Sequence, residues 1–297
     1  MATQTVSKLE TPFKPSTRII KSVRVVTTGS VDIHPEHIYG SNKPAIWWIF
    51  ASKQWVNVPI SVFIIEHRDG LVLFDTGMNR DVITNPHYFP GKVTEMFMDH
   101  IFKFHMNEDD TLTTQLNAAG FAASDVKKAV ISHLHFDHVG GISEIPQAEL
   151  VVCEKAWQHM LDPKSEKDVV LRDYIDIPSA NWHRIRYQEM DIPDIQPFKH
   201  AYDLMGDGSM LLFPTPGHLP GSLSMLVRRE NSPPLLMVGD LTYYTDLLMQ
   251  NNLAGTGDRK LLLDSFAKVR ELKQRLPDLQ ILPAHDWSAV ETLDLLF

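Results

Sequence analysis

Four side chains of the kind that bind metal ions stand within six positions of one short segment, and no other feature restricts the chain as strongly. The segment runs from Ser132 to Gly141, and these side chains are His133, His135, Asp137 and His138. An apolar stretch at 128–131 precedes it and predicts a buried strand. Alternate residues of an extended segment point to the same side, so the first two histidines can share one ion. A turn at Phe136 would let the next two side chains reach a second ion, which predicts a metal site at a strand end.

Any one of these histidines, taken alone, would more often be a residue of a polar loop or of the core. Three further candidate ligands follow other apolar strands, each at a turn: His218, Asp240 and His285. A lone His or Asp in such a place is more often a turn or capping residue. Together, however, these residues complete a ligand set for two divalent ions, which a bridging carboxylate holds about 3.5 to 4 Å apart. We predict that Asp240 is that bridge.

The donor atoms limit the choice of metal. Cys153 is the only cysteine, which excludes a thiolate-rich site and an intramolecular disulfide. Imidazole and carboxylate groups must therefore hold the ions. Zinc is the default for such donors, and iron, cobalt or manganese would accept them too. The sequence thus predicts two divalent metal ions, with zinc as the first choice.

Strands and helices alternate in clusters along the chain. Apolar runs bounded by Gly or Pro predict strands on both sides of Arg68-Asp69-Gly70 and at 128–131, 150–152, 210–213, 222–228, 235–238 and 280–282. Helices are predicted at 110–119 and 259–275, the second from an apolar stripe that repeats every three or four residues. Such a mixture indicates an α/β protein in which sheets pack together with helices outside. We predict an N-terminal arm at residues 1–21 and a single domain at residues 22–297.

Charge and hydropathy argue against two classes of partner. The formal net charge of -9 is the wrong sign for a broad surface that binds nucleic acid. The first twenty residues lack the apolar stretch of a secretory signal. The most apolar short window, 44–51, is far shorter than the ~20 residues of a membrane-spanning helix. We therefore expect a cytoplasmic protein that binds neither nucleic acid nor membrane, and we expect a homodimer.

The order and context of the candidate ligands resemble the metallo-β-lactamase superfamily. Within it the chain most resembles the N-acyl homoserine lactonases, through motifs that cover most of the chain. These motifs are Asn57-Val58-Pro59, Phe74-Asp75-Thr76-Gly77-Met78, the segment from Ser132 to His138, and Asp240 followed by Tyr243. The resemblance implies an αββα sandwich, in which two mixed sheets are flanked by helices and the site lies at one edge between them. One departure is Ser222, which stands where many relatives have a histidine that is not a ligand.

The resemblance also implies a role for each site residue. One ion would be held by His133, His135 and His218, and the other by Asp137, His138 and His285, with Asp240 bridging them. Asp75 would orient one of the ligand histidines. Coordination lowers the pKa of bound water by several units, so a hydroxide between the ions would be the nucleophile. Tyr243 would donate a hydrogen bond to the developing oxyanion, unless it is an ordinary half-buried aromatic, and Asp137 would pass a proton to the leaving alkoxide.

The implied reaction is the opening of the lactone ring of N-acyl homoserine lactones, which would silence a bacterial signal (quorum quenching). Other substrates of the same superfamily stay open: another small lactone such as a pyridoxine-derived lactone, a glyoxalase II-like thioester, or a phosphotriester. No clear basic cluster for the carboxylates of glutathione is visible. A β-lactamase is disfavoured, since one subclass has Cys in place of Asp240. A metal-binding module without catalysis is the alternative from another class.

Two segments rich in aromatic residues and Met, 44–55 and 96–102, could contact an acyl chain. Their large apolar side chains are Trp47, Trp48, Phe50, Trp55, Met96, Phe97, Met98, Ile101 and Phe102. These could line an apolar groove, form a dimer surface or pack in the core. The remaining histidines show no paired spacing at strand ends and are predicted to be surface or core residues: His34, His37, His67, His87, His100, His105, His159, His183 and His200.

Overall fold

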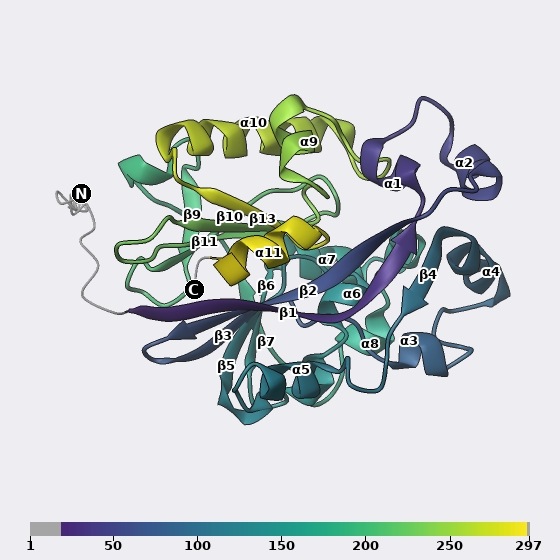
Figure 1. The fold of residues 1–297 in the computed structure, drawn as a ribbon, viewed down its shortest axis with the longest axis horizontal. Helices are drawn as coiled ribbons and strands as arrows, with labels where there is room; N and C mark the ends of the chain where they lie inside the picture. The colour runs from purple at the N-terminus through teal and green to yellow at the C-terminus, as the bar shows by residue number, and fades with distance from the viewer. Residues whose placement is uncertain (1–18, 296–297) are drawn as a thin grey trace, which may run out of the picture.

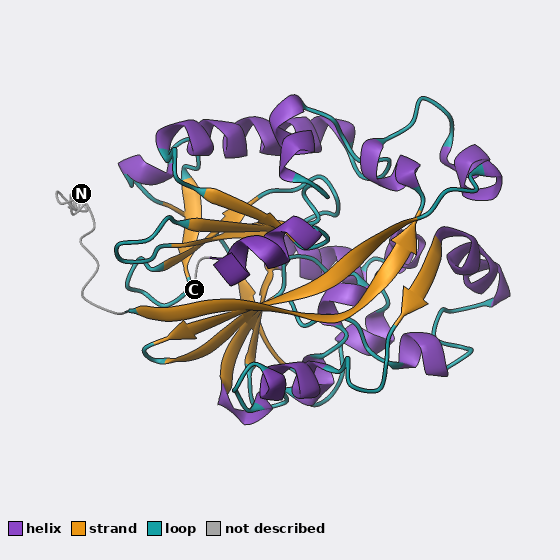
Figure 2. Cartoon of the chain, in the orientation of Figure 1, coloured by secondary structure: helices purple, strands orange, loops and turns teal. Residues whose placement is uncertain are grey.

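Two β-sheets lie face to face with helices on their outer sides in the computed structural model, which describes residues 19–295 (Figures 1 and 2). The seven-stranded sheet has the order β4-β1-β2-β3-β5-β6-β7, and the six-stranded sheet has the order β13-β12-β11-β10-β9-β8. Each sheet contains both antiparallel and parallel pairs of strands. The predicted αββα sandwich with two mixed sheets is therefore confirmed.

The first sheet is built around a long antiparallel pair, β1 and β2. Its strands are β1 (Ile20–Ile33), β2 (Val56–His67), β3 (Gly70–Phe74), β4 (Phe102–His105), β5 (Val126–Val130), β6 (Glu149–Cys153) and β7 (Asn181–Ile185). Residues 1–18 of the predicted arm lie outside the described residues. Ile20, near the end of the predicted arm, belongs to β1 and pairs with His67 of β2. The single domain at residues 22–297 stays a prediction.

The second sheet comes from the C-terminal half of the chain. Its strands are β8 (Gln188–Glu189), β9 (His200–Asp203), β10 (Met210–Pro214), β11 (Leu223–Val227), β12 (Leu235–Gly239) and β13 (Gln280–Pro283). The last two run parallel to each other, so their carboxyl ends meet at one edge of the sheet.

Helices cover the outer faces and the ends of the sheets (Figure 2). The α-helices are α1 (Pro35–Tyr39), α2 (Ala45–Ala51), α3 (Asp81–Thr84), α4 (Lys92–Ile101), α5 (Leu112–Ala118), α6 (Phe136–Val139), α7 (Glu154–Leu161), α8 (Arg172–Ile175), α9 (Thr245–Gln250), α10 (Arg259–Arg275) and α11 (Trp287–Leu295). Short 3-10 helices are η1 (Ala123–Asp125), η2 (Ile142–Glu144), η3 (Pro163–Asp168) and η4 (Pro193–Ile195). Of the helices in residues 19–295, none combines the length and the apolar character that crossing a membrane requires.

The longest helix, α10, has the bounds that its apolar stripe predicted. Leu262, Phe266 and Val269 are buried against the outer face of the second sheet. The side chain of Asp258 accepts hydrogen bonds from the backbone N–H groups of Lys260 and Leu261 and so caps the N-terminus. Burial of the stripe and this cap account for a helix at this place.

The core between the sheets is apolar, and its edge next to α1 and α4 is rich in aromatic residues. Phe63 and Phe74 of the first sheet share one buried cluster with Met225 and Met237 of the second. A separate buried cluster lies at the end where α1, α2, α4 and β4 gather (Figure 1). Its members include Ile38, Met98, Phe136 and Tyr243. This second cluster borders the candidate site.

Candidate metal centre

Strand ends from both sheets bring the candidate ligands together. His133 follows β5 of the first sheet, whereas Asp240 and His285 follow β12 and β13 of the second. The two sheets approach closely at Gly239, since a Cβ there would lie 2.8 Å from Cβ of Ser132. Gly239 also has a φ of 55°, a left-handed conformation that glycine adopts readily. Glycine at this position therefore allows Asp240 to lie beside His133.

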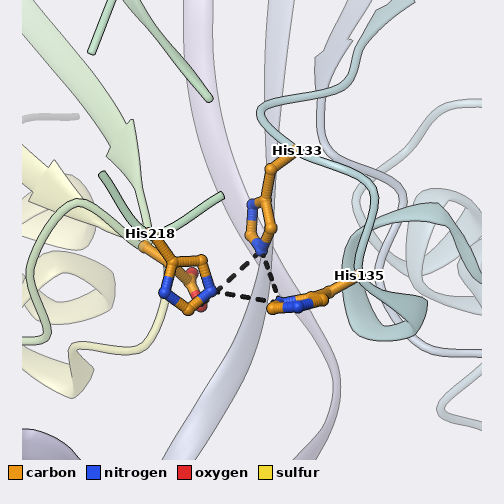
Figure 3. A group of neighbouring side chains, drawn as sticks. His133, His135 and His218 are labelled. Atoms are coloured by element: carbon orange, nitrogen blue, oxygen red, sulfur yellow. Dashed lines mark hydrogen bonds and ion pairs between the residues drawn. The ribbon is translucent and has the colours of Figure 1, made fainter. Parts of the chain in front are cut away.

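Three histidines form the first group: His133 and His135 come from the segment after β5, and His218 comes from the loop between β10 and β11 (Figure 3). Nδ1 of His135 lies 3.0 Å from Nε2 of His133 and 3.1 Å from Nε2 of His218. Oδ2 of Asp240 lies 3.3 Å from Nε2 of His218 and 3.8 Å from Nε2 of His133. The four side chains thus present four donor atoms within 4.8 Å of one another.

A second group lies on the other side of Asp240. Nε2 of His285 and Nε2 of His138 lie 3.5 Å and 3.8 Å from Oδ2 of Asp137. The remaining carboxylate oxygen of Asp240, Oδ1, lies 3.2 Å from each of these two nitrogens. One oxygen of Asp240 therefore faces each group, which is the arrangement that a bridging ligand requires.

The donor atoms of this arrangement fit cations better than they fit hydrogen bonds to one another. Nε2 of His138 and Oδ1 of Asp240 are buried without a hydrogen-bond partner among the described residues. The imidazole nitrogens of the first group point at one another, so their lone pairs need a shared positive charge. A tetrahedral ion with bonds of about 2.1 Å separates its nitrogen ligands by about 3.4 Å, close to the distances found here. The residues of both groups therefore fit divalent metal ions.

Hydrogen bonds outside the two groups set the orientation of the histidine rings. Asp75, which has a left-handed φ of 63°, accepts a hydrogen bond of 2.8 Å from Nδ1 of His138. The same carboxylate accepts hydrogen bonds from the backbone N–H and from Oγ of Ser132, at 2.7 and 2.8 Å. Nδ1 of His285 donates to the carbonyl of Pro59, and Nε2 of His135 donates to that of Asp168. In each ring the nitrogen that faces the candidate site is therefore the one that can bind an ion once it carries no proton.

Burial and charge act in opposite directions on the titratable groups. Burial lowers the pKa of His133 and His135, and it lowers the pKa of His218 to about 3. These three imidazoles are therefore uncharged, as a histidine must be in order to bind a metal ion. Burial would also lower the pKa of His138, but the carboxylates of Asp240, Asp75 and Asp137 outweigh it and raise that pKa well above its usual value. A cation must consequently displace a proton from His138 in order to bind there.

The candidate site opens into a cavity of about 570 Å³. One wall is apolar and is made by Val31, Ile33, Val58, Met98, Ile101 and Phe102. The segment 96–102 thus contributes three residues to the cavity. In the segment 44–55 the side chain of Trp48 is buried in the protein, whereas Trp47 and Phe50 are about half exposed, at 47% and 48%.

Tyr243 lies between the ligand groups and the apolar wall. Its ring is buried, lines the cavity and stacks on His285 with 5.7 Å between the ring centroids. Burial raises the pKa of its phenol well above the usual value, and the nearby carboxylates of Asp240 and Asp137 add to this effect. The phenol therefore stays protonated and can donate a hydrogen bond.

The sequence missed several residues that line the cavity. His37, predicted to be a surface or core residue, lies in α1 and faces the cavity, as do Lys167 and Thr256. Backbone contacts set the place of α1: the carbonyl of His37 accepts a hydrogen bond of 2.9 Å from the N–H of Gly255. The same loop reaches the metal centre, because the N–H of Asp258 donates to the carbonyl of Gly217, next to His218. Such long-range contacts leave no local pattern in the sequence.

The sequence and the fold both match known proteins. The family model described as "Metallo-beta-lactamase superfamily" matches residues 55–285. The N-acyl homoserine lactonase AttM of Azorhizobium caulinodans is 31% identical over 235 residues, which span 77% of this chain and 82% of the relative. The N-acyl homoserine lactonase of a Bacillus species is 27% identical over 73% of this chain and 77% of its own length.

The solved structures establish the similarity of the fold. An N-acyl homoserine lactone hydrolase, solved with the product N-hexanoyl-L-homoserine at its catalytic metal centre, superposes with a TM-score of 0.74 at 22% identity. The superposition covers 92% of this chain and 96% of that one. The dizinc quorum-quenching lactonase AidC gives a TM-score of 0.60 at 16% identity, over 90% of this chain and 88% of its own.

Proposed function

Because the chain belongs to the metallo-β-lactamase superfamily, in which it is 31% identical to a named N-acyl homoserine lactonase, we propose that it hydrolyses the lactone ring of N-acyl homoserine lactones. The observation that carries the proposal is the joint placement of two ligand groups, a shared carboxylate and a cavity with an apolar wall. The polar groups suit the ring, and the apolar wall suits the acyl chain.

The metal centre of the proposal uses the seven side chains predicted from the sequence. His133, His135 and His218 would hold one ion, Asp137, His138 and His285 the other, and Asp240 would bridge them. Zinc is the proposed metal, because imidazole and carboxylate donors suit it and no thiolate is near. When bound, two such ions lower the pKa of a water molecule and polarise a carbonyl group. The homodimer and the cytoplasmic location stay predictions from the sequence.

Tyr243 and Asp137 would act on the substrate directly. The phenol of Tyr243 donates a hydrogen bond to the lactone carbonyl oxygen as negative charge develops on it. Asp137 takes the proton that the attacking water releases and gives it to the ring oxygen when the bond from that oxygen to the carbonyl carbon breaks. The products are a carboxylate and a primary alcohol on one open chain. Hydrolysis by water requires no other reactant.

A substrate panel tests this proposal. The protein would be loaded with zinc and assayed for proton release on N-butanoyl, N-hexanoyl and N-decanoyl homoserine lactones, a β-lactam, an S-acyl glutathione and a phosphotriester. We expect turnover of the lactones that a chelator abolishes and added zinc restores. Asp240→Ala serves as the control for background hydrolysis. Turnover of a thioester or phosphotriester with none of any lactone would overturn the proposal.

A further inference from the structure

His37 is an unusual feature of the cavity because it is buried there without a hydrogen-bond partner. The side chain is 8% exposed and lines the cavity. Its Nδ1 is buried without a hydrogen-bond partner among the described residues, so Nε2 is the ring nitrogen that could bond a molecule in the cavity. An unpaired polar atom in a buried position costs free energy, so the free imidazole needs a functional or structural explanation.

The backbone around His37 is fixed by close contacts. A Cβ on Gly255 would lie 2.3 Å from the carbonyl oxygen of Glu36, and a Cβ on Gly40 would lie 2.7 Å from that of Leu253. Two glycines therefore let α1 and the loop at 253–257 approach at backbone distance. The ring is held as well, because it packs edge-on against Trp48 at 5.5 Å between centroids. His37 is thus a fixed polar group and not a mobile surface side chain.

The ring stands at the border between the two parts of the cavity. Its centroid lies 6.3 Å from that of Tyr243 and 5.8 Å from that of Phe102. Tyr243 adjoins the ligand groups, whereas Phe102 belongs to the apolar wall. Any substrate with its reacting carbonyl near Tyr243 and an alkyl chain along Phe102 places the connecting atoms beside His37.

The chemistry of the ring suits a neutral polar group at this border. Burial lowers the pKa of His37 to about 4, so the imidazole is neutral at neutral pH. A neutral imidazole has one N–H donor and one acceptor nitrogen. An amide offers Nε2 a carbonyl acceptor or an N–H donor, whichever the tautomer of the ring requires, whereas an alkyl chain offers neither.

We infer that His37 is a specificity-determining residue that hydrogen-bonds the amide joining the lactone ring to the acyl chain of the substrate. The inference rests on the proposed function and deepens it: the chain selects lactones that carry an amide next to the ring. A γ-lactone that carries only an alkyl chain leaves His37 unpaired in the complex. A site with a buried polar group discriminates against such an analogue.

The test compares two substrates of equal length on variants of the zinc-loaded enzyme. The substrates are N-hexanoyl homoserine lactone and α-heptyl-γ-butyrolactone, in which methylene groups replace the amide. His37→Phe keeps a planar ring without hydrogen-bonding atoms, and His37→Gln keeps a donor and an acceptor. Met98→Leu is the matched control, because Met98 lines the apolar wall, whereas Phe102 also contacts the ring of His37.

We expect His37→Phe to lower kcat/KM on the amide substrate about 10- to 100-fold and to change the alkyl lactone less than about threefold. His37→Gln should recover most of the amide preference, and Met98→Leu should change kcat/KM on both substrates by the same factor. Zinc content and melting temperature separate a failure to fold from a loss of recognition. The wild-type ratio of the two kcat/KM values tests the inference without any variant, and a ratio near one overturns it.

The two proposals fail in different ways. If the wild-type enzyme opens neither lactone, the proposed function is wrong. If it opens both and His37→Phe lowers both equally or neither, the lactonase assignment stands and the role of His37 is wrong.

Discussion

Replacing Asp75 by Asn should weaken metal binding without disrupting the fold. The carboxylate is buried and accepts three hydrogen bonds, two from Ser132 and one from Nδ1 of His138. The amide oxygen of Asn can still accept the bond from the backbone N–H of Ser132 at the place of Oδ1, but its NH₂ group then takes the place of Oδ2 and faces both Oγ of Ser132 and the N–H of His138. The imidazole escapes this clash by moving its proton to Nε2, which removes the lone pair that faces Asp240 and Asp137.

The size of the effect follows from one charge-assisted hydrogen bond. Such a bond contributes about 1.5 to 3 kcal/mol, and about 1.4 kcal/mol corresponds to a factor of ten. We therefore expect the affinity for the ion on His138 to fall about 10- to 100-fold, the range found when outer partners of metal ligands are removed. The ion on His133, His135 and His218 should be retained more strongly.

Competition with a chromophoric chelator measures both affinities, and thermal unfolding of the metal-free protein reports on the fold. Ser132→Ala is the control for the ion on His138, because it removes one hydrogen bond from Asp75 and leaves His138 its partner. It also removes the partner of Nδ1 of His133, so only the affinity of the ion on His138 is compared. Two zinc sites of wild-type affinity in Asp75→Asn would refute the reasoning, since Asp75 would then not set the tautomer of His138.

Three further predictions concern the same centre. Asp240→Ala should lose both ions and all activity, because each oxygen of Asp240 faces one group. Zinc content after gel filtration and lactone turnover check this expectation, and an active variant with two zinc ions would contradict it. Tyr243→Phe should keep both ions and lower kcat about 100- to 1000-fold, since it removes one donor to the oxyanion; an unchanged kcat would show that the phenol does not act. Zinc affinity should fall at least about tenfold for each pH unit of acidification, because a proton on His138, whose pKa is raised, competes with the ion. Titrations between pH 5 and 8 check this dependence, and a flat profile would contradict it.

The ligand groups could be predicted from the sequence because each residue follows a recognisable apolar strand. His133, Asp240 and His285 stand at the carboxyl ends of such strands, where neighbouring side chains meet at one edge. The helix at 259–275 was predicted with its bounds, since seventeen residues give a clear apolar stripe. The family resemblance supplied the arrangement of the sheets, which periodicity alone did not.

The N-terminal half of the cavity could not be predicted, and the reasons are physical. β1 has an irregular burial pattern without strict alternation, because both of its faces are partly covered. α1 has five residues, too few for an apolar period, and contacts with residues 253–257 determine its place. His37 therefore depends on contacts with a segment more than two hundred positions away, and the apolar wall depends on the pairing of β1 with β4, in which Ile33 lies opposite Phe102. A single sequence does not reveal these pairings.

The backbone bonds that join α1 to Gly255, and Asp258 to Gly217, have a consequence for how such an enzyme could diversify. They form a continuous mechanical link from one wall of the cavity to the loop that carries His218. A mutation that shifts α1 to admit a bulkier chain would pull on a ligand of the first ion. New chain-length preferences should therefore arise more readily at Met98 and Ile101, which have no such link, and engineering of substrate range should begin on that side.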